Sequence, residues 1–386
     1  MSHTEQRVQR LRSAFEAHGI DGLLVSQPES RYYLSGYTGH DLPPRDSAGY
    51  LLIGPSQALL LTDPRTTEQA EHEAPGFEVV TYPSGSRGPQ AVAEAASRLG
   101  VRRLGFESIH LPYAIFEEIR RELPDSVDLV PVAQIVDRLR IVKDAQELQA
   151  VQDAVDVLDR CLAHVLQRLE PGLTERQVAR MVELYLIEHA DGTSFPSIVA
   201  SGPNASVPHA VPSDRRIREG EAIKIDIGAR ASGYCSDMTR TVCLGQPRDQ
   251  RLVELHALVL EAQQHAEREL RPGMTGREGD SLARDVIARA GYGQAFTHGL
   301  GHGIGLEVHE PPWVSQSRGD EVLRPGMVFS VEPGVYLPGW GGVRIEDLVV
   351  LEPDGARVLC RSPKDLVVVG AGSASGSIFA GGVTQS

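Results

Sequence analysis

Several features are scarce in this chain, and each scarcity argues against a class of protein. No apolar run approaches the ~18 residues of a membrane-spanning helix, and the first residues, MSHTEQRVQRLR, contain no apolar signal core. Basic residues form no stripe and the formal net charge is −14, so we expect no nucleic-acid partner. The cysteines are few, far apart and without a CxxC pair, which is typical of reduced thiols in a cytoplasmic protein: Cys161, Cys235, Cys243 and Cys360.

The last part of the chain does contain four acidic residues and one histidine, each beside glycine or in a strand-like run. They are Asp226 in IKIDIG, Asp237 in GYCSDMTRT, His302 in HGLGHGIG, Glu332 in SVEPG and Glu346 in VRIED. Such an oxygen-rich set suits two hard or borderline divalent cations better than a thiolate-lined zinc site would. Four carboxylates also balance the charge of two such ions, whereas without metal they would repel one another. The simpler alternative is a pair of hairpins whose acids are only solvated.

An internal repeat relates two of these acids. The segment REGEAIKIDIG at 218–228 aligns with RPGMVFSVEPG at 324–334, which matches Asp226 with Glu332 at an offset of 106 residues. A similar match upstream, EPGLTE with RPGMTG, precedes a helix in each half. Each half therefore predicts helix, then strand, then an acidic hairpin.

The first hairpin can be predicted in more detail. Alternation along the strand puts its isoleucines on one face and Asp226 on the other. We place the turn at 230–233, which sets Asp226 directly opposite Asp237 with Cβ atoms about 5 Å apart. In the second half the two glutamates flank a longer turn at 338–342. Two related hairpins can thus present two acidic pairs to one pocket.

At this point the chain resembles the "pita-bread" metallopeptidases: Xaa-Pro dipeptidases (prolidases), aminopeptidase P and methionine aminopeptidases, with creatinase as a non-metal relative. The matching segments occur in the family's order: VASGPNASVPH (199–209), KIDIGARASGYCSDMTRT (224–241), THGLGHGIGLEVHE (297–310), PGMVFSVEPG (325–334) and GGVRIED (341–347). An N-terminal domain of about 130 residues precedes the catalytic part, which favours the proline-specific branch over a minimal methionine aminopeptidase.

The resemblance implies a dinuclear metal centre. Its ligands would be Asp226, Asp237, His302, Glu332 and Glu346, with Asp237 and Glu346 bridging the ions. Manganese fits the oxygen-rich set, and Co²⁺ or Zn²⁺ would also bind. Glu332 is our candidate for the proton shuttle. The complete ligand set argues against a creatinase-type hydrolase and against a non-catalytic binding protein on the same fold.

The resemblance also implies roles for four further residues. His209 would line the substrate pocket, and His309 would steady the tetrahedral intermediate. His298 would line the pocket on the proline side. His298 and His309 flank His302 in the sequence, and the alternative is that one of them only braces its neighbours through hydrogen bonds. Arg344 would either pin a carboxylate ligand or grip the substrate's terminal carboxylate, since an arginine fork matches a carboxylate.

The N-terminal part alternates strand-like and helical runs, which predicts a small α/β domain. Its segment 35–46, SGYTGHDLPPRD, is rich in glycine, proline and charge and should be an exposed loop. In prolidases, a loop of this domain reaches the neighbouring active site in a homodimer. We place His40, Asp41 and Arg45 there as substrate-binding residues, and the alternative is a solvated connector.

Together these features predict an α/β N-terminal domain (1–135), an α+β pita-bread catalytic domain (136–370) and a flexible tail (371–386). The predicted activity is hydrolysis of Xaa-Pro bonds in proline-containing peptides. We lean to a dipeptidase because the chain is compact, with aminopeptidase P as the alternative, and expect a cytoplasmic homodimer that binds no membrane.

Overall fold

The structure is a computed structural model that describes residues 2–41, 47–83 and 88–370. The chain divides into two compact units, Met1–Arg140 and Ile141–Ser386. We placed the boundary at residue 135, and the tail predicted at 371–386 lies outside the described residues. None of the helices in the described ranges is both long and apolar enough to cross a membrane.

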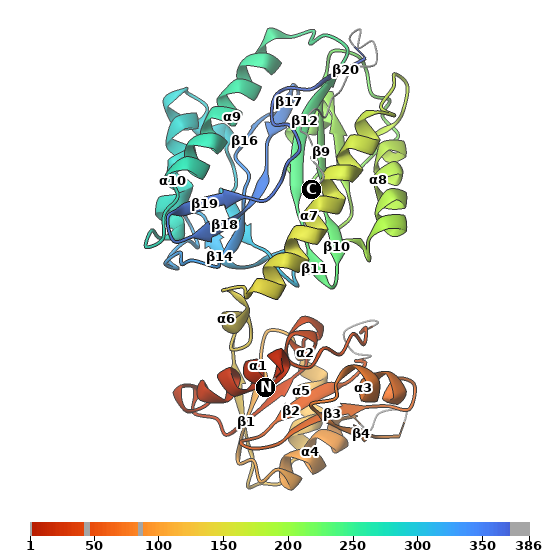
Figure 1. The fold of residues 1–386 in the computed structure, drawn as a ribbon, viewed down its shortest axis with the longest axis vertical. Helices are drawn as coiled ribbons and strands as arrows, with labels where there is room; N and C mark the ends of the chain where they lie inside the picture. Colours follow the sequence, from red (N-terminus) through yellow and green to blue (C-terminus); the bar gives the residue numbers. More distant parts are fainter. Residues whose placement is uncertain (1, 42–46, 84–87, 371–386) are drawn as a thin grey trace, which may run out of the picture. The chain divides into compact units, whose positions relative to one another are not determined.

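The N-terminal unit is built on a six-stranded sheet in the order β4-β3-β2-β1-β5-β6 (Figure 1). Its strands are β1 (Gly22–Val25), β2 (Tyr50–Ile53), β3 (Ala58–Thr62), β4 (Glu78–Thr81), β5 (Arg103–Glu107) and β6 (Asp128–Val132). The helices are α1 (His3–Ser13), η1 (Glu16–His18), α2 (Pro28–Ser35), α3 (Thr67–Glu73), α4 (Gly88–Arg98), α5 (Tyr113–Glu122) and α6 (Asp137–Arg140). The sequence analysis missed α2, which Pro28 opens at the first helical position, where its missing N–H costs nothing.

The first half of the second unit begins with two helices and continues into a four-stranded sheet, ordered β20-β12-β9-β8. Its elements are α7 (Ala145–Leu166), α8 (Glu175–His189), β7 (Gly192–Thr193), β8 (Ile198–Ser201), η2 (Gly202–Ser206), β9 (Ala222–Ile227), β10 (Ala229–Ala231), β11 (Tyr234–Cys235) and β12 (Met238–Leu244), and β20 is Val368–Val369.

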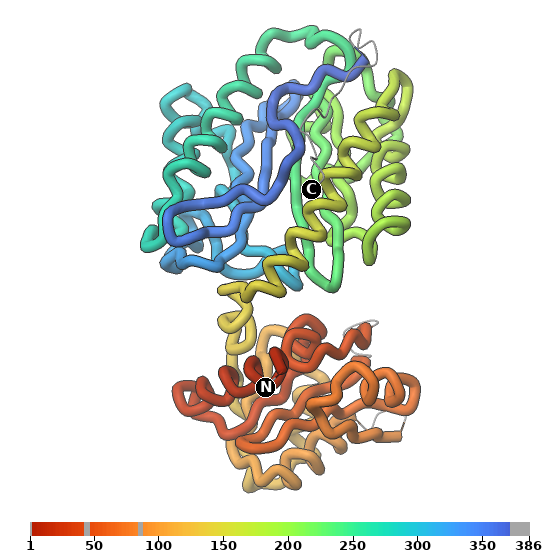
Figure 2. The backbone as a smooth tube through the Cα atoms, in the orientation of Figure 1, coloured from red at the N-terminus to blue at the C-terminus, as the bar shows by residue number. Residues whose placement is uncertain are grey.

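The second half repeats this plan with a five-stranded sheet, ordered β14-β13-β15-β18-β19, and a separate β16–β17 ribbon. Its elements are α9 (Gln250–Glu269), α10 (Gly276–Arg289), η3 (Gly293–Ala295), β13 (Gly301–Gly303), β14 (Glu310–Val314), β15 (Val328–Val331), β16 (Gly334–Leu337), β17 (Gly341–Arg344), β18 (Asp347–Glu352) and β19 (Gly355–Val358). The tube in Figure 2 shows the two halves following one another along the chain, yellow-green and then teal-blue.

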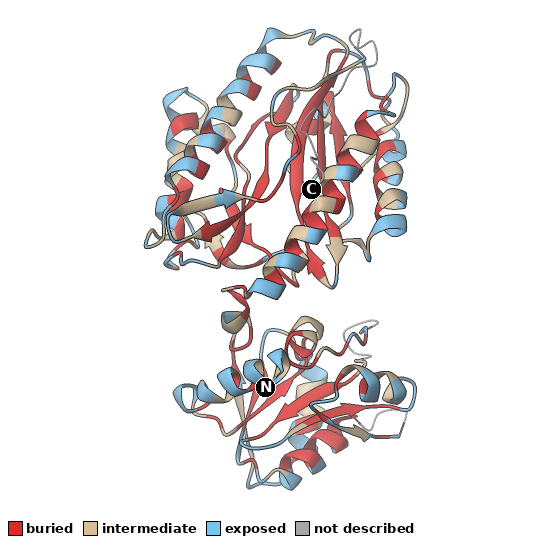
Figure 3. Ribbon diagram, viewed as in Figure 1, coloured by how far each residue is buried: buried red, intermediate tan, exposed pale blue. Residues whose placement is uncertain are grey.

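Matching caps confirm the repeat of the helices. Thr174 and Thr275 each form a capping box with the residue three positions later, Gln177 and Glu278, and open α8 and α10. The strands between the helices are mostly buried, while the outer faces of the helices are exposed (Figure 3).

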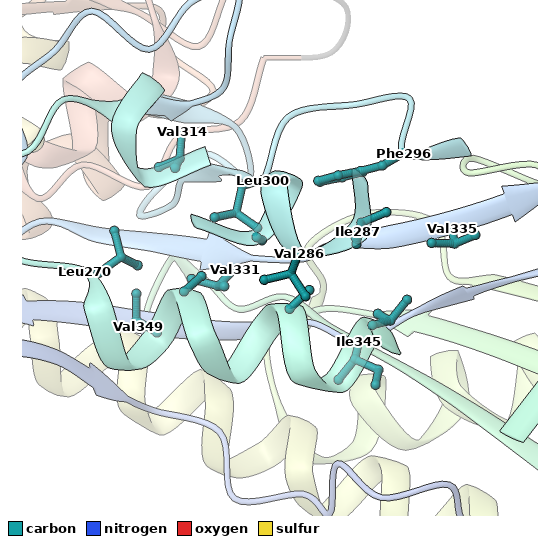
Figure 4. Packing of buried hydrophobic residues seen from close by; sticks show 14 of the residues in the cluster. Leu270, Val286, Ile287, Phe296, Leu300, Val314, Val331, Val335, Ile345 and Val349 are labelled. Carbon is teal, nitrogen blue, oxygen red and sulfur yellow. The ribbon is translucent and has the colours of Figure 1, made fainter. Parts of the chain in front are cut away.

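Between α9, α10 and the second sheet lies an apolar core, which includes Val286, Val331 and Ile345 (Figure 4). Full burial of each such side chain contributes about 1.5–3 kcal/mol. The residues directly before Glu332 and Glu346 are therefore anchored in this core.

Candidate metal centre

The first acidic hairpin is formed by β9 and β12, and in it Asp226 lies opposite Thr239. Our predicted register, with Asp226 directly opposite Asp237, is wrong by two residues. The turn is centred on Ser232 and Gly233, whose φ angles are 50° and 77°. A two-residue turn of this kind needs positive φ at both central positions, so it forms one residue later than we expected. Asp237 is thus a diagonal neighbour of Asp226, and both line the same cavity.

The second acidic hairpin carries Glu332 just after β15 and Glu346 just before β18. The flanking strand pairs, β15–β18 and β16–β17, keep one register, which sets the two glutamates level with each other. The hairpins meet at Thr239, whose hydroxyl donates to Glu346 Oε2 at 2.6 Å and whose carbonyl accepts from Glu346 N at 3.0 Å. Two acidic pairs from separate halves therefore converge.

His302 lies on β13, between the two glycines that let neighbouring main chains approach. A Cβ at Gly301 would collide with the carbonyl of Ser330, and one at Gly303 with the carbonyl of Pro311. These glycines let β13 lie against β14 and β15, which fixes His302.

The candidate ligands lie within reach of one another. His302 Nε2 is 3.4 Å from Glu332 Oε1 and 3.8 Å from Asp237 Oδ2. Asp237, His302 and Glu346 each offer a ligand atom within 4.8 Å of the others. Asp226 Oδ1 and Asp237 Oδ1 are buried oxygens with no hydrogen-bond partner among the described residues. Such oxygens are costly unless a cation satisfies them, so these residues fit a metal centre.

Burial and repulsion both act on the acids in the absence of a cation. Burial first, and then neighbouring carboxylates, raise the pKa of Asp237 and Glu346 well above the usual range. Burial raises the pKa of Glu332 to about 7, against the opposing effect of Arg344. Since four clustered carboxylates resist ionising together, bound cations would stabilise the ionised set.

The histidine of the cluster is held in the form that binds metal. His302 Nδ1 lies 3.2 Å from the carbonyl oxygen of Gly303, so Nδ1 donates there and Nε2 faces the carboxylates. Burial lowers the pKa of His302 to about 4. The ring is therefore neutral at physiological pH, as a metal ligand must be.

The contacts of Arg344 suit the first of its two predicted roles, which is to pin a carboxylate ligand. Its side chain is only 3% exposed and its Nη2 donates to Asp226 Oδ2. Nε donates to Thr239 Oγ1 at 2.9 Å, and Nη1 donates to the Tyr336 hydroxyl at 3.0 Å. All three donors point into the protein, which suits a residue that pins a carboxylate better than one that grips substrate.

His298 is braced through the same arginine. The Tyr336 hydroxyl accepts from Arg344 and lies 2.9 Å from His298 Nε2, while His298 Nδ1 lies 2.7 Å from the carbonyl oxygen of Gly299. Nδ1 therefore donates to Gly299 and Nε2 accepts from Tyr336. Burial lowers the pKa of His298 to about 3, which keeps this neutral arrangement in place at the cavity wall.

The other two predicted histidines, His209 and His309, are both exposed. His309 packs edge-on against His302, with ring centroids 4.2 Å apart, and burial lowers its pKa to about 4. His209 is exposed in the loop that follows η2. Both line the cavity, so each is placed to donate an N–H to an oxygen that gains charge there.

The cavity joins the five candidate ligands, the three histidines and Arg344 in a volume of about 550 Å³. Part of its wall is apolar: Phe195, Pro196, Ile198, Val308 and Trp313. An exposed cation, Arg318, also lines it, and the guanidinium carbon lies 3.6 Å from the Trp313 ring centroid. The cavity therefore combines acidic, apolar and basic surfaces.

Three further residues that contact or line the site were not predicted from the sequence: Thr239, Tyr336 and Arg318. Strand alternation could have found Thr239, which stands two residues after Asp237 on the same face. Arg318 lies in a polar loop with no periodic pattern, so the sequence offered no signal for it.

The N-terminal loop residues are only partly described. His40 is exposed. Asp41 accepts two hydrogen bonds from the buried Arg31, at 2.9 and 3.1 Å, and one from Ala48 N at 2.7 Å. Arg45 lies outside the described residues. Asp41 therefore anchors its own loop, which leaves His40 as the described residue of the three that is free to face solvent.

Comparisons with known proteins agree along the whole chain. Residues 149–353 match Metallopeptidase family M24, and residues 7–142 match the Creatinase/Prolidase N-terminal domain. The uncharacterized peptidase YqhT of Bacillus subtilis (strain 168) is 42% identical over 364 residues, which are 94% of this chain and 100% of that protein.

Two solved structures are similarly close. An Xaa-Pro dipeptidase from Bacillus anthracis has a TM-score of 0.89 and 39% identity, covering 95% of this chain and 99% of that one. An X-Pro aminopeptidase from Thermotoga maritima MSB8 has a TM-score of 0.83 and 36% identity, covering 92% and 100%. The predicted fold class is confirmed.

Proposed function

The chain belongs to metallopeptidase family M24, and from that premise we propose that it is an Xaa-Pro dipeptidase dependent on two divalent metal ions. The observation that carries the proposal is the convergence of two acidic hairpins and His302 on one cavity, with buried carboxylate oxygens that have no donor in the part of the chain that the structure describes. The similarity to an Xaa-Pro dipeptidase and to an X-Pro aminopeptidase supports the substrate class.

Asp226, Asp237, His302, Glu332 and Glu346 would hold the metal ions. Manganese fits these oxygen ligands, and Co²⁺ and Zn²⁺ are the alternatives. Bound ions of this kind activate water and polarise a carbonyl.

The chain's own residues supply positioning and proton transfer. Glu332 Oε1 accepts from Ser330 Oγ at 3.0 Å, which steadies the carboxylate that we propose carries the proton from water to the leaving nitrogen. His309 and His209 donate to the oxygen of the scissile carbonyl as it gains charge. Arg344 holds Asp226 and, through Tyr336, the ring of His298.

A free carboxylate next to proline distinguishes a dipeptide from a longer substrate. Arg318 is our candidate for its binding site, because it is an exposed cation on the cavity wall. A hydrogen bond to a charged group is worth about 1.5–3 kcal/mol. Aminopeptidase P is the alternative, since a longer peptide has no such carboxylate at that position.

The test compares Ala-Pro, Ala-Pro-Ala and Met-Ala with manganese-loaded protein. We expect Ala-Pro to be cleaved with the highest kcat/KM, and Arg318→Ala to raise its KM about tenfold or more. Arg357→Ala, which removes an arginine outside the cavity, is the control. Preference for the tripeptide would establish the aminopeptidase, and binding without cleavage would indicate a non-catalytic protein.

We also propose a cytoplasmic homodimer in which His40 and Arg45 of one subunit approach the other subunit's cavity. The buried free thiols of the four cysteines support a reducing compartment. Replacing His40 and Arg45 together by alanine should then weaken dipeptide KM about tenfold and relax discrimination against tripeptides. Unchanged kinetics on both substrates, or a monomeric wild type in sedimentation, would refute this arrangement.

A further inference from the structure

Lysine is rare in this chain: only three of its 38 basic residues are lysine. Two of the three form ion pairs, Lys143 with Glu310 at 2.7 Å and Lys364 with Glu267 at 2.7 Å. Within residues 2–41, 47–83 and 88–370, no ion pair involves Lys224, although this lysine is fully buried. Burial of a lysine without a carboxylate partner costs folding free energy. The contacts of Lys224 should therefore offset this cost.

Lys224 donates to two main-chain carbonyls. Its Nζ lies 2.6 Å from the carbonyl oxygen of Val207 and 2.8 Å from that of Pro208. It also lies 5.3 Å from the centroid of the Tyr336 ring. Lys224 is two residues before Asp226 on β9, so strand alternation directs both side chains to the same face.

The two carbonyls immediately precede His209. Arg344 Nη1 reaches the second of them, on Pro208, at 3.3 Å. On the other side of His209, Ala210 is buried against a small apolar cluster. His209 itself and Val211 beyond it are exposed, Val211 by 85%. The loop is therefore exposed to solvent at His209. The main chain before His209 is held by hydrogen bonds, and Ala210 after it is held by apolar packing.

We propose that Lys224 is a positioning residue that clamps the main chain before His209 and thereby fixes the direction of the His209 ring over the cavity. The kinetic consequence rests on the proposed function, whereas the clamp itself does not. Burial lowers the pKa of Lys224 to about 7. The neutral amine retains two N–H groups, so both protonation states can hold both carbonyls.

The clamp is tested by hydrogen exchange. In Lys224→Met, which keeps most of the apolar part of the side chain but has no donor, amides of 205–211 should exchange faster while those of β9 stay protected. Lys224→Gln, which keeps an amide donor on a shorter chain, is the second variant and should show a smaller increase. Unchanged exchange at 205–211 in both variants overturns the proposal, whether or not the protein cleaves Xaa-Pro bonds.

A double-mutant cycle tests the link to His209. We expect Lys224→Met to lower kcat by about 10²-fold, the scale of a misplaced group, with similar KM and retained metal. In the His209→Ala background the same change should cost less than about threefold, because coupled residues are not additive. Lys364→Met is the matched control, and its effect should simply add to that of His209→Ala. Additive losses for Lys224→Met would overturn the proposal.

Discussion

Replacing Thr239 by valine removes one hydroxyl from the candidate metal centre and nearly keeps the shape of the side chain. Thr239 is fully buried and bridges two charged groups: it donates to Glu346 Oε2 at 2.6 Å and accepts from Arg344 Nε at 2.9 Å. The substitution leaves Glu346 short of a donor and Arg344 short of an acceptor. We therefore expect weaker metal binding by a folded protein.

The magnitude follows from the charge of the partners. A hydrogen bond to a charged group contributes about 1.5–3 kcal/mol, and loss of a partner that orients a metal ligand typically costs 10–100-fold in metal affinity. The Thr239 hydroxyl also lowers the pKa of Glu346, whose burial raises it. Its loss should make metal binding more sensitive to acid, because only the ionised carboxylate binds metal.

The assay is a manganese titration of chelated protein, followed calorimetrically at several pH values. Thr241→Val is a close control, because Thr241 is also buried on β12 but its hydroxyl, among the described residues, hydrogen-bonds only to the main chain of Arg344, at 2.9 and 3.1 Å. We expect about 10–100-fold weaker binding for Thr239→Val and near wild-type binding for Thr241→Val. Equal affinities for both variants would refute the reasoning.

Three further predictions address the rest of the site and the N-terminal unit. His309→Ala should lower kcat by roughly 10²-fold or more with metal content retained; loss of metal instead would make His309 a brace of His302. In the metal-free protein, the stability that Glu332 contributes should fall as pH rises from about 4.5 to 7, because folding raises its pKa to about 7 and the folded state keeps a proton that the unfolded state has already released. The depressed histidine pKa values act oppositely below the unfolded histidine pKa of about 6.5, so the contribution is measured as the difference between thermal melts of wild type and Glu332→Gln; a difference that does not fall over this range, or that falls equally with manganese bound, would contradict this. Asp41→Ala should destabilise the N-terminal unit by about 3 kcal/mol or more, because it leaves the buried Arg31 without its carboxylate; an unchanged urea midpoint would show that carbonyls suffice.

The acids and the duplicated plan could be predicted because they follow local rules. Asp226 and Glu332 stand at equivalent positions of a repeat, and the helix caps at Thr174 and Thr275 are readable from four residues each. The register of the first hairpin could not be fixed with the same certainty. The register depends on which two residues of the turn adopt positive φ. One of them is Ser232, and a serine does not indicate positive φ as a glycine would.

The contacts around the ligands depend on tertiary structure. Tyr336 acts on His298 and Arg344 across separate strands, and no local pattern marks that triangle. The glycines around His302 leave room for the main chains of neighbouring strands, at Ser330 and Pro311. A glycine in the sequence indicates that another group approaches the main chain closely, but only the fold shows which group that is.

The central claim is that two metal ions, held by acids from both halves, are required for cleavage of Xaa-Pro bonds. The most direct measurement titrates manganese into exhaustively chelated protein and follows bound metal and Ala-Pro hydrolysis in the same samples, for wild type, Asp237→Ala and Glu346→Ala. We expect about two ions per chain in the active wild type, and both variants should be folded but inactive. Full activity after chelation, or normal activity in either variant, would contradict it.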